Sequence, residues 1–108
     1  MGDAAWKAFE RRIASVFGGR RRGPDFRGPD GGKSDVVVQG WSVEVKLLSR
    51  PSFGDLLAAT RQAELAALPD QIPVATIKKK HADDADTLVC IRLETFRAWF
   101  LPEGGCEP

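Results

Sequence analysis

The chain has 108 residues, of which 43% are hydrophobic and 29% charged, and its formal net charge is +1 at pH 7. This length fits one domain and the composition is that of an ordinary globular protein, while the net charge alone gives no reason to expect a polyanionic partner. No signal segment or membrane-length apolar run is present, so we expect no membrane partner. The two cysteines lack metal-ligand spacing, which favours a cytoplasmic location.

The first predicted element is a helix from residue 3 to about residue 17. Asp3 is a suitable N-cap and Gly18 is a stop signal. Apolar residues recur at three- and four-residue spacing and predict the core-facing side: Trp6, Phe9, Ile13, Val16 and Phe17. Glu10 borders this side. It either pairs with Arg11 or Arg12, or points across the edge of the core toward the acids described below.

Residues 18–33 follow as a segment rich in glycine and proline, without apolar periodicity, which predicts a mobile loop. It contains two acids and five basic residues: Arg20, Arg21, Arg22, Arg27 and Lys33. A loop this long in a compact domain is usually functional or disordered. It either keeps the chain soluble or receives a phosphate backbone.

The stretch that organises the rest of the chain is residues 34–48. A β-branched run ends at Val38, and from Trp41 to Leu48 apolar and polar residues alternate, as in a strand with one face in the core. Between the two runs lies Gln39-Gly40, which suits the turn of a two-residue hairpin. The sequence therefore predicts a β-hairpin here.

The register of that hairpin brings two acids together. With the turn at residues 39 and 40, Val36 faces Val43 and Asp35 faces Glu44, with their Cβ atoms roughly 5 Å apart. Lys46 follows two residues later on the same face. Opposed like charges weaken a hairpin, whereas a hard cation such as Mg²⁺ binds paired carboxylates. The alternative is a solvated polar face on which the lysine neutralises one acid.

A second helix is predicted from residue 53 to about residue 67. Ser52 and Asp55 form an approximate capping box at its start. One side consists of small or apolar residues that let the helix lie close to a sheet: Leu56, Ala59, Thr60, Ala63 and Ala67. Arg61 and Gln62 point away from that side and can reach solvent or a ligand.

The last third predicts a strand over residues 72–78, a second basic cluster at residues 78–80, a turn, and a strand over residues 87–93 paired with the first as a hairpin. A short helix over residues 94–101 closes the fold. Its Phe96, Trp99 and Phe100 are predicted to be core residues, with a dimer contact as the second interpretation. From residue 102 we expect a loose tail.

This order of elements, with an acid on the first helix and D-x8-E-x-K on the hairpin, resembles the PD-(D/E)xK nuclease superfamily. The chain is most similar to the small Holliday junction resolvases of archaea and their phages. The resemblance implies a mixed α/β fold: one restriction-endonuclease-like domain over residues 1–101, with a flexible tail at 102–108. Its central mixed sheet would have about four to five strands flanked by helices. Ser34 stands where the family name implies a proline.

The resemblance also implies the members of the active site. Asp35 and Glu44 would be metal ligands together with the backbone carbonyl of Val45, and Lys46 would be the catalytic lysine. Glu10 matches the first-helix acid that assists the metal, directly or through water. The implied cofactor is Mg²⁺, with Mn²⁺ as a substitute and no organic cofactor.

The implied reaction is hydrolysis of phosphodiester bonds in four-way DNA junctions by paired nicks, carried out by a homodimer on branched DNA. The alternatives are a related nuclease acting on other branched or single-stranded DNA, or a non-catalytic DNA-binding module of the same fold. Contacts to DNA are expected from the two basic clusters and from residues beside the site: Arg20, Arg21, Arg22, Arg27, Lys33, Ser34, Arg61, Gln62, Lys78, Lys79 and Lys80.

Overall fold

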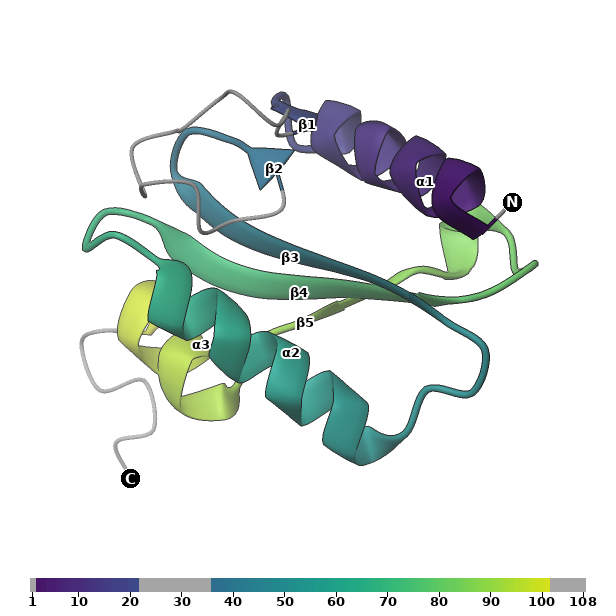
Figure 1. Ribbon diagram of the computed structural model, residues 1–108. Coiled ribbons are helices and arrows are strands. Elements are labelled where there is room, and N and C mark those ends of the chain that lie inside the picture. Colours follow the sequence, from purple (N-terminus) through teal and green to yellow (C-terminus); the bar gives the residue numbers. More distant parts are fainter. Residues whose placement is uncertain (1, 22–35, 102–108) are drawn as a thin grey trace.

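The computed structural model describes residues 2–21 and 36–101, which form three layers. Helix α1 (Gly2–Val16) lies on one face of a β-sheet and helix α2 (Phe53–Ala66) on the other (Figure 1). The sheet has the order β3 (Trp41–Leu48), β4 (Ile72–Lys79), β5 (Leu88–Cys90), with β3 parallel to β4 and β5 antiparallel to it. The predicted mixed α/β class is confirmed. Within the described residues this sheet has three strands, not the four to five expected.

The predicted hairpin is only partly present. The turn forms, because Gly40 adopts a φ of +86° that a residue without a side chain tolerates. The strands beside it have other partners: β2 (Val36–Val37) pairs antiparallel with β1 (Arg20–Arg21), and β3 pairs along its whole length with β4. The pairing of Val36 with Val43 is therefore corrected, and the predicted loop from residue 18 begins with a short strand.

The core between α1 and the sheet follows the predicted alternation of β3. Val43 and Val45 are 1% exposed and pack with Phe9 and Ile13 of α1, and Trp41 and Leu47 lie at the edge of the same cluster. On α1 two predicted core residues are wrong: Trp6 is 36% exposed and Val16 is 78% exposed, whereas Ala14 is buried. At about 100° per residue, the side of the helix that buries Phe9, Glu10, Ile13 and Ala14 is centred about 90° away from Val16.

Helix α2 covers the opposite face of the sheet. The capping box is confirmed, since the Ser52 hydroxyl accepts from the Asp55 amide at 3.1 Å and the Asp55 carboxylate accepts from the Ser52 amide at 3.0 Å. Ala59, Thr60, Ala63 and Ala66 are buried toward the sheet. These small side chains bring the helix backbone close to β3 and β4.

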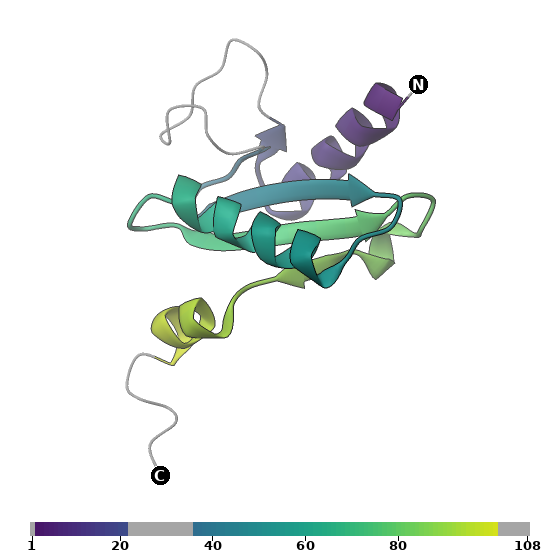
Figure 2. The ribbon, with the colours of Figure 1, turned by 60° about the horizontal axis from the view of Figure 1, so that its bottom comes forward.

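The C-terminal part differs most from expectation. After η1 (Asp84–Asp86), strand β5 is shorter than predicted, because helix α3 (Leu93–Phe100) already begins at Leu93. No residue of α3 is buried, and the helix extends away from the sheet (Figure 2). The prediction that Phe96, Trp99 and Phe100 are core residues is wrong: they are 39%, 37% and 47% exposed.

A charged cluster ties α1 to the segment after β4. Lys78 is buried, and its ammonium donates to the Ala82 carbonyl at 2.8 Å and to the Asp84 carboxylate at 2.9 Å. Arg12 of α1 also donates to Asp84, with one guanidinium nitrogen at 3.1 Å. These hydrogen bonds, first from Arg12 and then from Lys78, lower the pKa of Asp84 to about 2. The acid therefore stays charged and holds both cations.

Replacing Asp84 with asparagine is expected to destabilise the fold by about 1–2 kcal/mol, because the buried Lys78 ammonium loses its charged partner. The pKa of Asp84 is lowered on folding, so its stabilisation is complete above the ordinary value of about 3.9 and is lost as the pH falls to about 2. Between these pH values, the melting temperature should therefore fall more steeply with decreasing pH for the wild type than for Asp84→Asn. Equal slopes would contradict this role.

None of the helices within residues 2–21 and 36–101 combines the length and the apolar character needed to span a bilayer.

Candidate active site

Strand β3 places an acid and a lysine side by side on its α2-facing side. Val43 and Val45 face α1, so the alternating residues Ser42, Glu44 and Lys46 face the other way. The Glu44 side chain is 2% exposed and the Lys46 side chain 35% exposed, and a carboxylate oxygen of Glu44 lies 3.5 Å from the Lys46 ammonium. The predicted common face for these two residues is confirmed, as an ion pair between a buried acid and a partly exposed base.

Small side chains make room for Glu44 beneath the helix. Its cross-strand neighbour on β4 is Ala75, which is buried in one cluster with Ala59 of α2. Taking a carboxylate out of water is costly, and well-packed apolar residues in place of a buried ion pair are often as stable or more stable. Glu44 is therefore a poor choice for stability alone, which favours a functional role.

Two buried hydroxyls fix the backbone around Glu44. Ser42 donates to the Ala63 carbonyl of α2 at 2.8 Å, and Thr76 of β4 donates to the Glu44 carbonyl at 3.0 Å. Both residues are about 1% exposed. Sequence reasoning did not assign them a role. The position of Ser42 beside Glu44 could have been predicted from the sequence, because the two residues share a strand face. Thr76 becomes a neighbour of Glu44 only through the parallel pairing of β3 and β4.

The other predicted ligands are placed only in part. Glu10 is 2% exposed on α1, the helix that packs on the Val43 side of the sheet, so it lies on the opposite face from the Glu44 side chain and not beside it as predicted. Val45 lies in register with Thr76. Asp35 and Ser34 lie outside the described residues, so the opposition of Asp35 and Glu44 stays a prediction. Within residues 2–21 and 36–101, no three His, Cys, Asp or Glu side chains gather in a way that could hold a metal.

The predicted DNA-binding residues fall into different settings. Lys79 and Lys80 are exposed beside Leu48 at the C-terminal end of β3, and the Lys80 amide donates to the Leu48 carbonyl. Arg20 and Arg21 form β1, beside the strand that leads into the start of β3. Lys78 is instead buried and bound to Asp84.

Two more of these residues are exposed on α2: Arg61 and Gln62. Both therefore point away from the sheet, as predicted. Arg22, Arg27 and Lys33 lie outside the described residues.

The fold and this site together define a mixed α/β domain with a Glu-x-Lys ion pair, its acid buried and its base partly exposed, on a strand that is parallel to its neighbour. Comparison of the chain with protein-family models, with curated proteins and with solved structures finds no match. The function therefore has to be inferred from the residues themselves.

Proposed function

We propose that this protein is a metal-dependent, structure-selective DNA endonuclease with a restriction-endonuclease-like fold, which hydrolyses phosphodiester bonds in four-way junctions by paired nicks. The observation that carries this proposal is the Glu44 carboxylate, buried beneath α2 and paired at 3.5 Å with the Lys46 ammonium. An acid and a lysine at this spacing on one strand face match the E-x-K half of the motif identified in the sequence.

The donors fit a hard divalent cation in kind. Glu44 supplies carboxylate oxygens, Val45 supplies a backbone carbonyl, and Asp35 would add the second carboxylate, since oxygen ligands are those that Mg²⁺ takes in proteins. Glu10, which lies on the opposite face of the sheet from the Glu44 side chain, is not among these donors. When bound, Mg²⁺ lowers the pKa of a coordinated water and polarises a phosphate oxygen.

Lys46 has the setting required of a catalytic lysine. Its side chain is 35% exposed, so it can reach a substrate while it remains next to the Glu44 carboxylate. A positive charge fixed at this position would orient the attacking water or stabilise the negative charge that develops on the phosphate in the transition state. Ser42 and Thr76 hold the strand so that this charge keeps its place.

Binding of DNA would be carried by phosphate contacts. Lys79 and Lys80 extend from the sheet end two residues beyond Lys46, where a backbone phosphate next to the site would pass. Contacts to phosphates position a duplex without reading its sequence. We therefore expect recognition of DNA shape, and affinity that falls as salt increases.

The test is a nicking assay with the full chain on a four-way junction and on a linear duplex of the same sequence, with Mg²⁺ and with EDTA. We expect paired, metal-dependent cuts on the junction, preferred over the duplex by more than tenfold, about 1.4 kcal/mol. Equal cutting of several branched or single-stranded substrates would favour the related nuclease. Tight binding without cleavage would favour the non-catalytic module, and neither binding nor cleavage would contradict the proposal.

A further inference from the structure

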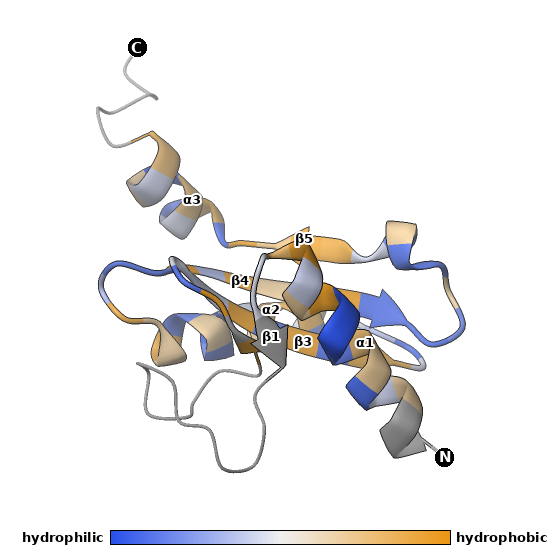
Figure 3. Ribbon diagram, turned by 90° about the horizontal axis from the view of Figure 1, so that it is seen from above, coloured by the Kyte–Doolittle hydropathy of each residue, from blue (hydrophilic) through white to orange (hydrophobic). Residues whose placement is uncertain are grey.

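Strand β5 is the outer strand of the sheet, and among the described residues it pairs with β4 alone (Figure 3). In an antiparallel pair, every second residue of the outer strand points its amide and carbonyl away from the sheet. The backbone is also extended at both flanks of β5, with φ and ψ of −66° and 133° at Thr87 and −71° and 148° at Arg92. A pairing edge can therefore extend over residues 87–92.

The side chains of this edge lack the features that usually prevent a further strand from pairing. Leu88 and Val89, on opposite faces of β5, are 56% and 58% exposed. The run 87–91 contains no charged residue and no proline, the residue types that proteins commonly place on open edges. Apolar side chains exposed on both faces of an open edge suit the addition of a strand from another chain.

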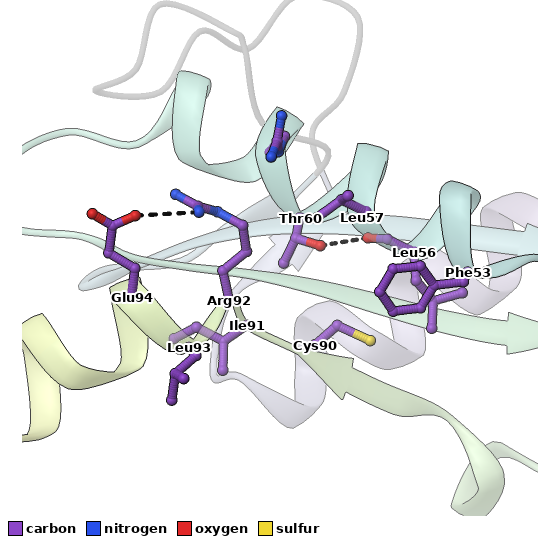
Figure 4. Close-up of a pocket in the computed structure, with 10 residues that line it drawn as sticks. Phe53, Leu56, Leu57, Thr60, Cys90, Ile91, Arg92, Leu93 and Glu94 are labelled. Atoms are coloured by element: carbon purple, nitrogen blue, oxygen red, sulfur yellow. Dashed lines mark hydrogen bonds and ion pairs between the residues drawn. The ribbon is translucent and has the colours of Figure 1, made fainter. Parts of the chain in front are cut away.

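Two adjoining pockets lie between this edge and α2. Their volumes are about 590 and 370 Å³, and they share Phe53 and Leu56 of α2. On the strand side, Cys90 lines the larger pocket and Leu88 the smaller one (Figure 4). Leu88 and Cys90 are two residues apart on one strand face, so the pockets follow the spacing of alternate side chains. A strand added to β5 can thus place alternate side chains in both pockets.

We propose that this edge binds an extended peptide of another protein, which adds a strand antiparallel to β5 and places apolar side chains in the two pockets. Antiparallel pairing is the more stable and the more frequent arrangement. Main-chain hydrogen bonds to β5 supply the affinity, and the pockets supply the specificity. The inference concerns a protein partner and is independent of the nuclease proposal.

The charges that line the pockets favour an acid in this peptide. In the larger pocket Arg92 and Glu94 form an ion pair with each other, whereas the exposed Arg61 forms no ion pair with a described residue. In the smaller pocket the charges of Lys79 and Asp86 offset each other. Arg61 lies toward the C-terminal end of β5, which an antiparallel peptide reaches first. The complementary peptide therefore has an acid, followed two and four residues later by apolar side chains.

The test begins with a selection of peptides on the full chain, without DNA or metal, from a display library of random short peptides. We expect the selected peptides to share the pattern of an acid followed two and four residues later by apolar residues. Apolar residues at three- and four-residue spacing would indicate a bound helix and would overturn strand addition. Selection without any shared pattern would overturn a peptide partner.

The best selected peptide is then labelled with a fluorophore and titrated with protein up to about 100 µM, because contacts of this size are weak. Two forms of it, each methylated on every second backbone amide, test the hydrogen bonds to β5. One form loses the donors that face β5 and the other loses those that face away. We expect the first to lose measurable binding and the second to bind like the parent peptide. Equal affinities of the two forms would contradict strand addition.

Variants of the chain test the pockets. Phe53→Ala, at a side chain that is 79% exposed, should fold and should weaken binding about tenfold or more, because an apolar contact is lost. Arg61→Ala should weaken binding about two- to fivefold, as for an exposed ion pair. The matched control is Leu65→Ala, 85% exposed on the same helix and outside both pockets, which should bind like the wild type.

Wild-type affinity of Phe53→Ala would place the peptide elsewhere and overturn the proposal. Because no cleavage is measured, failure here leaves the nuclease proposal to its own assay.

Discussion

Lys46→Ala is expected to reduce junction cleavage by about 10²–10³-fold or more, because one fixed charge next to the reacting phosphate typically contributes this much to the rate. Binding of the junction should change little, since Lys79 and Lys80 remain. The measurement is single-turnover nicking with saturating Mg²⁺, together with a binding isotherm for the same junction. A loss in rate without a loss in binding identifies a group that acts on the transition state.

The control for this variant is Lys7→Ala, which removes an exposed lysine from α1 and should leave both measurements unchanged. Thermal unfolding of Lys46→Ala is needed beside it, because the buried Glu44 carboxylate loses a partner at 3.5 Å. If Lys46→Ala is folded and still cleaves at the wild-type rate, the mechanism proposed for the Glu44–Lys46 pair is wrong.

Phe9→Ala is expected to lower the free energy of unfolding by about 3–5 kcal/mol, which is a large part of the roughly 5–15 kcal/mol of a whole domain. Phe9 is fully buried in the cluster of α1 with Val43 and Val45. Truncation leaves a cavity between α1 and the sheet that the neighbouring strands cannot fill. Urea denaturation, followed by circular dichroism, measures the change.

Phe9→Leu separates the two contributions of this ring. Leucine keeps most of the apolar contact but removes the aromatic face, whose centroid lies 4.9 Å from the Lys78 ammonium and 5.8 Å from the Arg12 guanidinium. We expect a loss of about 1–2 kcal/mol, the range of a largely buried cation–π contact. Leu65→Ala, at a side chain that is 85% exposed, should change stability by less than about 0.5 kcal/mol. An equal loss for Phe9→Leu and Phe9→Ala would contradict this division.

Features set by near neighbours in the chain were predictable. The alternation from Trp41 to Leu48 correctly assigns Val43 and Val45 to the core and places Glu44 and Lys46 together on the other face. The capping box of α2 was equally local, because Ser52 and Asp55 are only three residues apart. In both cases the backbone geometry of one strand or one helix decides the outcome.

Features set by distant partners were not predictable. The run 78–80 suggests three solvated lysines, yet Lys78 is buried. Strand β4 directs its side chain toward Phe9, and its ammonium forms an ion pair with Asp84. The β-branched run before the turn pairs with Arg20–Arg21, a segment that its glycines mark as loop. Likewise, the apolar stripe of α3 predicts a buried helix, but the stripe itself cannot show that the rest of the domain leaves it exposed.

The ion pair between Arg12 and Asp84 has a consequence for how the protein is made. Its two residues are 72 positions apart, so α1 is synthesised long before Asp84, the ion-pair partner of Arg12. Until Asp84 is synthesised, α1 can pack against the valines of β3 but lacks this ion pair. The contacts of α1 are thus complete only after Asp84 has been synthesised, and a nascent chain halted before Asp84 would lack the ion pair that holds Arg12.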